Sequence, residues 1–326
     1  MIVKDEERFL EQCLNSVKDI VDEIIIVDTG SKDKTKEIAK KFNAKIYDFK
    51  WVDDFSAARN ESLKHATKDW VLVLDADEVL DEKGLKKIKE LVENSEDNAA
   101  GFQLEQRSYI NSYFEGAVKN ESNFNLAKNY QFYISNFLVR LFKNRLELHF
   151  KHRVHELTED SIEEKNLEYR RTDIVLHHFG SLKDENFVND RIGQYSKMIL
   201  KQLEEEPDNA RYNYQAGRMH LGRNDFSNAL RYFEKTAEID PNYKLVFSEI
   251  AKIYLQMNDG NRAIEYFKKS MEHNPDNPSP ANNLAVVYMS MEKFKQAKKI
   301  LEGQLKKHPN NKALKYNYEE VLKKVG

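Results

Sequence analysis

Short apolar runs alternate with amphipathic stretches through the N-terminal part of the chain. The runs 23–28 (EIIIVD) and 71–74 (VLVL) are typical of strands that are covered on both faces of a parallel sheet. Strand and helix patterns follow each other in strict order, which predicts an α/β domain with a mostly parallel, Rossmann-like sheet. Expected strands cover 1–4, 23–28, 44–49 and 71–74, and expected helices cover 5–20, 32–42 and 53–66.

The second half repeats with a period of 34 residues. Prolines mark the period at Pro207, Pro241, Pro275 and Pro309. Small and bulky residues recur between them in fixed registers: Ala229, Ala263 and Ala297, then Phe233, Phe267 and Leu301. This pattern resembles the tetratricopeptide repeat, in which each unit is a helical hairpin that buries its apolar face against the next. We therefore expect a solenoid of three repeats and a capping helix over 207–326, a linking helix over 183–206, and the α/β domain over 1–182.

The segment between the two patterns is less regular. Residues 107–135 are rich in Asn, Ser, Tyr and Phe without a clear period, so we expect a long loop there, within a region (101–135) that has no readable motif. Residues 136–150 and 172–180 have the composition of β structure.

Composition and charge exclude several classes of protein. The chain has 326 residues, 40% of them hydrophobic, and a net charge of −3, which gives no bulk attraction to nucleic acid. Cys13 is the one cysteine and lies on the apolar face of an expected helix, so we interpret it as a core residue. The sequence shows neither a transmembrane segment nor a signal-peptide pattern, and we expect a cytoplasmic protein.

Aspartates stand where two of the expected strands end. Asp28 closes one run, and Asp75 and Asp77 follow the run 71–74. In such sheets ligands bind beyond the carboxyl ends of the strands. If the backbone stays extended, Asp75 and Asp77 point to the same side. The sequence therefore predicts a site for a hard divalent cation, Mn²⁺ or Mg²⁺, that carries phosphates.

Several motifs, taken in order, resemble glycosyltransferase family 2, whose members have the GT-A fold. They are MIVKDEE (1–7), VDTGSKDKT (27–35), DDFSAARN (53–60) and DWVLVLDADE (69–78), followed more loosely by RLF (140–142), RVHE (153–156) and HHFG (177–180). With tetratricopeptide repeats behind this domain, the chain resembles the bacterial subgroup of sublancin-type peptide S-glycosyltransferases. The resemblance implies an inverting hexosyltransferase that takes a sugar from a nucleotide donor, UDP first of all.

The resemblance also implies roles for individual residues in holding the donor. Asp77 would bind the cation on the diphosphate, and Asp75 the ribose or the sugar. Asp28 matches the first acidic position of the nucleotide-binding turn, whereas the second, which often contacts the base, is Thr29 here. Arg59, from the AARN element, would contact the nucleotide or the diphosphate.

Catalytic residues are sought in the later motifs. An inverting transfer needs a base beside the acceptor, and we favour Glu156 over His155 and the pair Glu159–Asp160. The alternative for Glu156 is a structural ion pair with Arg140 or Arg153, and His155 could orient the acceptor. His178 could be a third metal ligand beside Asp75 and Asp77, or a structural histidine.

Three functions compete on this sequence. The first is transfer of sugar to a protein or peptide, with the repeats as the acceptor surface or as a homodimer contact. The second is assembly of a lipid-linked or cell-surface polysaccharide, which would need a membrane partner. The third is a scaffold whose α/β domain is inactive, which the intact set of acidic residues argues against.

Overall fold

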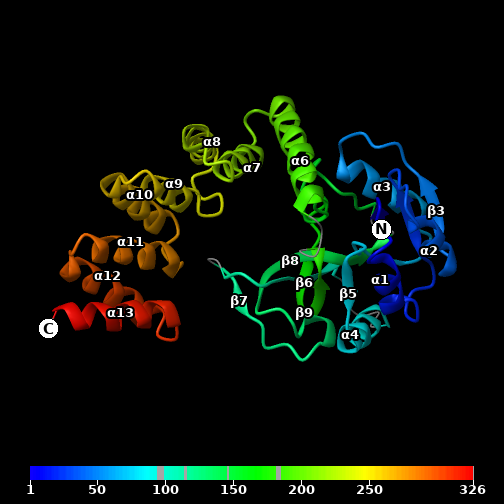
Figure 1. Cartoon of the computed structure of the whole chain (residues 1–326), viewed down its shortest axis with the longest axis horizontal. Coiled ribbons are helices and arrows are strands. Elements are labelled where there is room, and N and C mark those ends of the chain that lie inside the picture. The colour runs from blue at the N-terminus through cyan, green and yellow to red at the C-terminus, as the bar shows by residue number, and fades with distance from the viewer. Residues whose placement is uncertain (94–98, 114–115, 145–146, 181–184, 326) are drawn as a thin grey trace. The chain divides into compact units, whose positions relative to one another are not determined.

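The computed structural model describes residues 1–93, 99–113, 116–144, 147–180 and 185–325, except for the side chains of 185–192. The chain divides into two units, Met1–Met198 and Ile199–Gly326. The division falls inside the helix α6 (Glu185–Glu205). The boundary predicted between 182 and 183 lies outside the described residues and stays a prediction. An α/β unit followed by an all-helical unit confirms the predicted fold class (Figure 1).

A small parallel sheet opens the first unit. Its strands are β1 (Ile2–Val3), β2 (Ile25–Asp28) and β3 (Lys45–Asp48), in the order β1-β2-β3. The connecting helices are α1 (Leu10–Val17) and α2 (Thr35–Lys41), and α3 (Phe55–His65) follows β3 and packs against β1 and β2. The Asp54 carboxylate caps α3 by accepting a hydrogen bond of 2.9 Å from the Ala57 amide. The predicted alternation of strands and helices is thus present.

The fourth predicted strand belongs to a second sheet, which the sequence pattern did not reveal. This strand is β4 (Trp70–Leu72), and it pairs antiparallel with β8 (Phe132–Lys143) rather than with the parallel strands. The sheet order is β4-β8-β6-β9-β5, with β5 (Glu78–Leu80), β6 (Gly101–Ile110) and β9 (Tyr169–His178), and β7 (Val118–Lys119) pairs with β8. The remaining elements of this part are α4 (Glu82–Glu93), α5 (Glu159–Glu164) and the short 3₁₀ helix η1 (Asn125–Ala127).

The loop predicted over 107–135 is partly wrong. Strand β6 continues to Ile110, and β8 already starts at Phe132, so both ends of this segment are paired in the sheet. Tyr109 lies opposite Tyr133 and Ile110 opposite Phe132. Aromatic and β-branched cross-strand pairs stabilise a sheet without any helical or simple alternating pattern in the sequence, which explains the error.

An irregularity interrupts the parallel pairing of β6 with β9. Between the pairs Gln103–Arg171 and Glu105–Val175, β9 contains two more residues than β6. Thr172 stabilises the bulge, because its hydroxyl donates a hydrogen bond of 2.8 Å to the Gln103 carbonyl. Beyond the bulge, Arg107 lies opposite His177 and Ser108 opposite His178.

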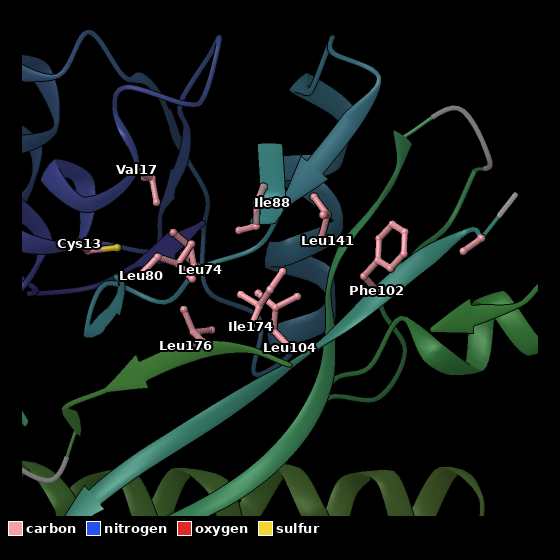
Figure 2. Close-up of a cluster of buried hydrophobic side chains, with 11 residues drawn as sticks. Cys13, Val17, Leu74, Leu80, Ile88, Phe102, Leu104, Leu141, Ile174 and Leu176 are labelled. Carbon is pink, nitrogen blue, oxygen red and sulfur yellow. The ribbon is translucent and has the colours of Figure 1, made fainter. Parts of the chain in front are cut away.

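The largest buried cluster joins the mixed sheet to the helices α1 and α4 (Figure 2). Cys13 and Val17 from α1 meet Leu74 and Leu80, which flank the turn after β4. Cys13 is fully buried and unoxidised, as its interpretation as a core residue required. Because both residues that flank the turn after β4 are packed in this core, the position of the turn is fixed.

Glu23 connects three segments of the first unit, and its contacts predict a pH-dependent contribution to stability. Its carboxylate accepts hydrogen bonds from Lys45 Nζ (2.7 Å) and the Thr67 amide (2.6 Å). Burial alone would raise the pKa of Glu23, but these partners lower it to about 2. Glu23→Gln should therefore lower the free energy of unfolding above about pH 4, where the unfolded carboxyl is ionised, and the difference should vanish as the pH falls toward 2. Urea unfolding at pH 7, 5 and 3 measures this; a difference independent of pH would contradict it.

The second unit consists of helical hairpins in the predicted registers. Asp225 and Asp259 cap the second helices of two hairpins with their carboxylates. Ala229, Phe233, Ala263 and Phe267 are fully buried. Its helices are α7 (Ala210–Leu221), α8 (Phe226–Ile239), α9 (Val246–Gln256), α10 (Gly260–His273), α11 (Pro278–Ser290), α12 (Phe294–Lys307) and α13 (Lys312–Val325). No helix in the described ranges is long and apolar enough to cross a membrane.

Close packing inside a hairpin predicts the effect of one added methyl group. A Cβ at Gly217 would lie 2.8 Å from two ring atoms of Phe233, whereas a Cβ at Gly222 would have ordinary contacts of 3.6 Å or more. Gly217→Ala should therefore destabilise the second unit by about 1–3 kcal/mol, because an overpacked core must shift. Thermal or urea unfolding followed by circular dichroism measures this. Gly222→Ala is the matched control and should be nearly neutral; equal effects of both would contradict the packing argument.

Candidate active site

The segment after β4 forms a turn instead of continuing as a strand. Strand β4 ends at Leu72, and the Glu78 amide donates to the Asp75 carbonyl at 3.1 Å. The Glu78 carboxylate in return accepts a hydrogen bond of 2.7 Å from the Asp75 amide. The extended geometry that would point Asp75 and Asp77 to the same side is therefore absent, and the two carboxylates have different partners.

Arg59 on α3 holds two of the predicted site residues together. Its Nε donates to Glu156 Oε1 at 2.5 Å, and its NH2 donates to Asp75 Oδ1 at 2.6 Å. The side chain is almost fully buried, and among the described residues its NH1 has no hydrogen-bond partner. Glu156 is thus in an ion pair, as the structural alternative required, but with Arg59 rather than Arg140 or Arg153.

Arg140 and Glu78 extend this network, and the sequence analysis assigned neither to the site. Arg140 NH2 donates to Asp75 Oδ2 at 3.2 Å and to Glu78 Oε1 at 3.1 Å. Gln106 on β6 donates to the same Glu78 oxygen. Arg140 and Glu78 are 62 positions apart. Their contact depends on the tertiary structure, and the local signal was that each lies within a quoted motif, Arg140 in RLF (140–142) and Glu78 in DWVLVLDADE (69–78).

Burial and charge act in opposite directions on the two carboxyls. Burial would raise the pKa of Asp75, but the nearby guanidinium groups of Arg59 and then Arg140 hold it well below its usual range. Burial raises the pKa of Glu78, and the attraction of Arg140 offsets this only in part. Asp75 therefore stays ionised, with both of its oxygens on arginines.

Asp77 lies beside His178, the histidine of the HHFG motif. The His178 Nε2 is 3.6 Å from Asp77 Oδ1. The Phe179 amide donates to the Asp77 carbonyl at 2.9 Å, which fixes the turn against the end of β9. On the other side of the ring, His178 Nδ1 is 2.9 Å from the Ser108 hydroxyl.

Gly180 packs closely against these two side chains. A Cβ at this position would lie 2.7 Å from His178 Nε2 and 2.9 Å from Asp77 Oδ2. Among the described residues, no three His, Cys, Asp or Glu side chains converge on one cation position. Two protein ligands nevertheless suit Mg²⁺ or Mn²⁺ that is bound mainly through substrate phosphates. Asp77 and His178 therefore fit the predicted cation, while the oxygens of Asp75 are bound by arginines.

Asp28 and Thr29 lie at the carboxyl end of β2. Asp28 Oδ1 accepts hydrogen bonds of 2.9 Å from the amides of Gly30 and Ser31, and its Oδ2 is buried without a partner among the described residues. The Thr29 amide and hydroxyl both donate to the Val3 carbonyl. No described hydrogen bond or ion pair connects these two residues with Asp75 or Asp77. The unused oxygen of Asp28 is a buried acceptor that suits an N–H or O–H of a ligand.

His155 differs in setting from its neighbour Glu156. It is exposed, its φ is +53°, and its ring centroid lies 6.0 Å from that of Tyr195. A left-handed backbone is uncommon outside glycine, although histidine, like asparagine and aspartate, adopts it more often than other residues. The structure thus places His155 at the surface, whereas its neighbour Glu156 is a member of the ion pair with Arg59.

Models of known protein families match parts of both units. The glycosyl transferase family 2 model matches residues 1–152, and tetratricopeptide repeat models match 210–243 and 254–316. A TPR repeat-containing protein of Synechococcus elongatus is 32% identical over 241 residues, covering 72% of this chain and 55% of that protein. The SPbeta prophage-derived glycosyltransferase SunS of Bacillus subtilis is 28% identical over 248 residues, covering 75% and 53%.

A shorter match has a higher identity. An uncharacterized glycosyltransferase of Rickettsia typhi is 39% identical over 83 residues, which is 26% of this chain and 28% of that protein. The chain spans about half the length of the first two relatives (55% and 53%). Together with the α/β fold and the helical repeats, these matches show that the chain joins an N-terminal family 2 glycosyltransferase domain to C-terminal tetratricopeptide repeats.

Proposed function

We propose that the chain is an inverting hexosyltransferase that moves a sugar from a nucleotide donor, UDP-sugar first of all, to a side chain of a protein or peptide. The observation that supports this most directly is the pair formed by Asp77 and His178, whose Oδ1 and Nε2 atoms are 3.6 Å apart, in a domain of this family. The two side chains supply an oxygen and a nitrogen that can bind a cation on a diphosphate, and Asp77 lies in the same turn as Asp75.

The donor would be held by residues from three elements. Asp77 and His178 would bind Mn²⁺ or Mg²⁺, and the cation would neutralise negative charge on the leaving diphosphate. The buried Oδ2 of Asp28 would accept a hydrogen bond from the nucleoside, with Thr29 beside it. Arg59 has one N–H group still unused and is held rigidly by two carboxylates, so it is suited to donate to a phosphate oxygen.

The proposed reaction is a single displacement at the anomeric carbon. The acceptor nucleophile forms the new bond from the face opposite the diphosphate, and the bond from that carbon to the diphosphate oxygen breaks. The oxygen keeps the electron pair, and the acceptor proton passes to a base. The proposed base is Glu156, whose Oε1 is held by Arg59, which leaves Oε2 for the acceptor.

Glu156→Gln separates a base from a purely structural partner of Arg59. If Glu156 is the base, the variant should keep donor binding and lose sugar transfer. If it only holds Arg59, the variant should lose stability and donor binding together. His155→Ala is the neighbouring comparison, because that exposed side chain is proposed only to orient the acceptor.

The repeat unit is proposed to present the acceptor. Solenoids offer extended surfaces for peptides, and SunS, which also carries the name glycosyltransferase, aligns over most of this chain. The same unit could hold two copies of the chain together. Light scattering of the purified protein distinguishes a dimer from a monomer.

The proposed function is tested with the purified chain and a panel of UDP- and GDP-sugars, with Mn²⁺, with Mg²⁺, or without either. We expect at least one UDP-sugar to raise the melting temperature in the presence of the cation, because a ligand of the native state stabilises it. Slow release of UDP without acceptor should accompany this binding. If no sugar nucleotide in the panel binds or reacts, the proposal is wrong.

A further inference from the structure

The contact between Ser108 and His178 comes from two strands that are distant in sequence. Ser108 on β6 lies directly opposite His178 on β9, and its Oγ is 2.9 Å from His178 Nδ1. Both side chains are partly exposed, so the pair lies at the edge of the site rather than in the core. The backbone of Ser108 is held in place, because β6 is paired on both sides, with β8 and with β9.

The two nitrogens of this imidazole have different surroundings. Nδ1 faces Ser108, whereas Nε2 faces Asp77 Oδ1 at 3.6 Å and lies close to Gly180. A histidine binds a cation through an unprotonated nitrogen, so Nε2 can serve only when the proton is on Nδ1. The Ser108 oxygen is placed to accept a hydrogen bond from that Nδ1–H. Such a bond fixes both the tautomer and the orientation of the ring.

The neighbouring histidine shows that this arrangement is specific to one face of the sheet. His177 is 2% exposed, and its Nδ1 is 2.7 Å from the Tyr109 hydroxyl, with Phe124 stacked on the ring at 4.0 Å. Side chains alternate along strands. Consequently the side chains of Tyr109 and His177 pack in the core, while those of Ser108 and His178 lie on the face that bears Asp77.

We propose that Ser108 is a positioning residue for cation binding: its hydroxyl holds His178 with Nε2 directed toward Asp77, so that the two side chains can bind one cation. This inference rests on the proposed function, because it assigns a role in the cation site of the same domain. It adds a residue that belongs to none of the sequence motifs. Ser108 touches neither the cation nor the donor and acts through His178 alone.

The test measures Mn²⁺ affinity directly, from the electron paramagnetic resonance signal of free Mn²⁺ in the presence of UDP. We expect Ser108→Ala to weaken Mn²⁺ binding by about 10- to 100-fold, the usual effect of losing an outer hydrogen bond to a metal ligand. Ser108→Thr keeps the hydroxyl and should restore most of the affinity. His178→Ala gives the reference for complete loss of the ligand.

Ser135→Ala is the matched control. This serine lies on β8 of the same sheet and donates to Glu105 at 2.6 Å, away from His178. It should leave Mn²⁺ affinity unchanged. The inference is wrong if Ser108→Ala binds Mn²⁺ as tightly as the wild type, or if Ser135→Ala loses as much. If the wild type with UDP binds no Mn²⁺, the cation of the proposed function is itself refuted, and the positioning role with it.

Discussion

Asp77→Asn should lower the rate of UDP release from the donor by about 100-fold or more. The cation is expected to contribute several kcal/mol to stabilising the leaving diphosphate, and each 1.4 kcal/mol corresponds to a factor of ten in rate. Asparagine has nearly the same shape but no charge, and Asp77 is 6% exposed, so the change tests charge more than packing. UDP release is measured by a coupled assay over a range of Mn²⁺ concentrations.

Asp173→Asn is the control for Asp77. Asp173 lies on β9, is largely exposed, and forms an ion pair with Lys87. Its loss should leave both the rate and the Mn²⁺ dependence unchanged, since exposed ion pairs contribute little. If Asp77→Asn retained the wild-type dependence on Mn²⁺, the assignment of the cation to Asp77 would be refuted, whatever the absolute rate.

Arg59→Ala should destabilise the first unit by about 3–5 kcal/mol, because it removes a buried guanidinium group and leaves two partly buried carboxylates without this partner. Glu156 loses its ion pair, and Asp75 keeps only Arg140. Arg59→Lys should recover only part of this loss, because a single ammonium group cannot replace Nε and NH2 at two separate carboxylates. Urea unfolding followed by circular dichroism and tryptophan fluorescence measures the change, since both tryptophans precede residue 71.

Lys87→Ala serves as the comparison for Arg59, because it removes a cation from a more exposed ion pair in the same unit. Its effect should be within about 0.5 kcal/mol. A small effect of Arg59→Ala, comparable to that of Lys87→Ala, would show that the network around Asp75 does not support the fold. Loss of donor binding in an Arg59 variant that remains folded would then point to a role in the site alone.

Much of the fold was predictable because its signals are local. The order of strands and helices, the Asp54 cap and the 34-residue registers each depend on residues close in sequence. The mixed sheet was harder to predict, since β4 finds its partner β8 more than sixty residues away. Its strands are held by cross-strand aromatic pairs such as Tyr109–Tyr133, which leave no period in the sequence.

The residues of the site also divide into those that local motifs predicted and those that only the tertiary structure revealed. Motifs located Asp77, Arg59, Glu156 and His178, and the structure brings Arg59 to Glu156 and Asp77 to His178. The sequence alone did not show that Asp75 and Asp77 have different partners, because it predicted an extended backbone where Glu78 closes a turn. The partners Arg140 and Ser108 also required the sheet, since each contact crosses two strands.

The bulge between β6 and β9 decides which histidine belongs to the site. It adds two residues to β9, an even number, so the strand returns to the same phase beyond it. If the pairing beyond the bulge kept its positions, gain of one residue would place His177 opposite Ser108, and loss of one would place Phe179 there. The number of residues in the bulge, more than their identity, therefore sets which side chain of β9 stands beside Asp77.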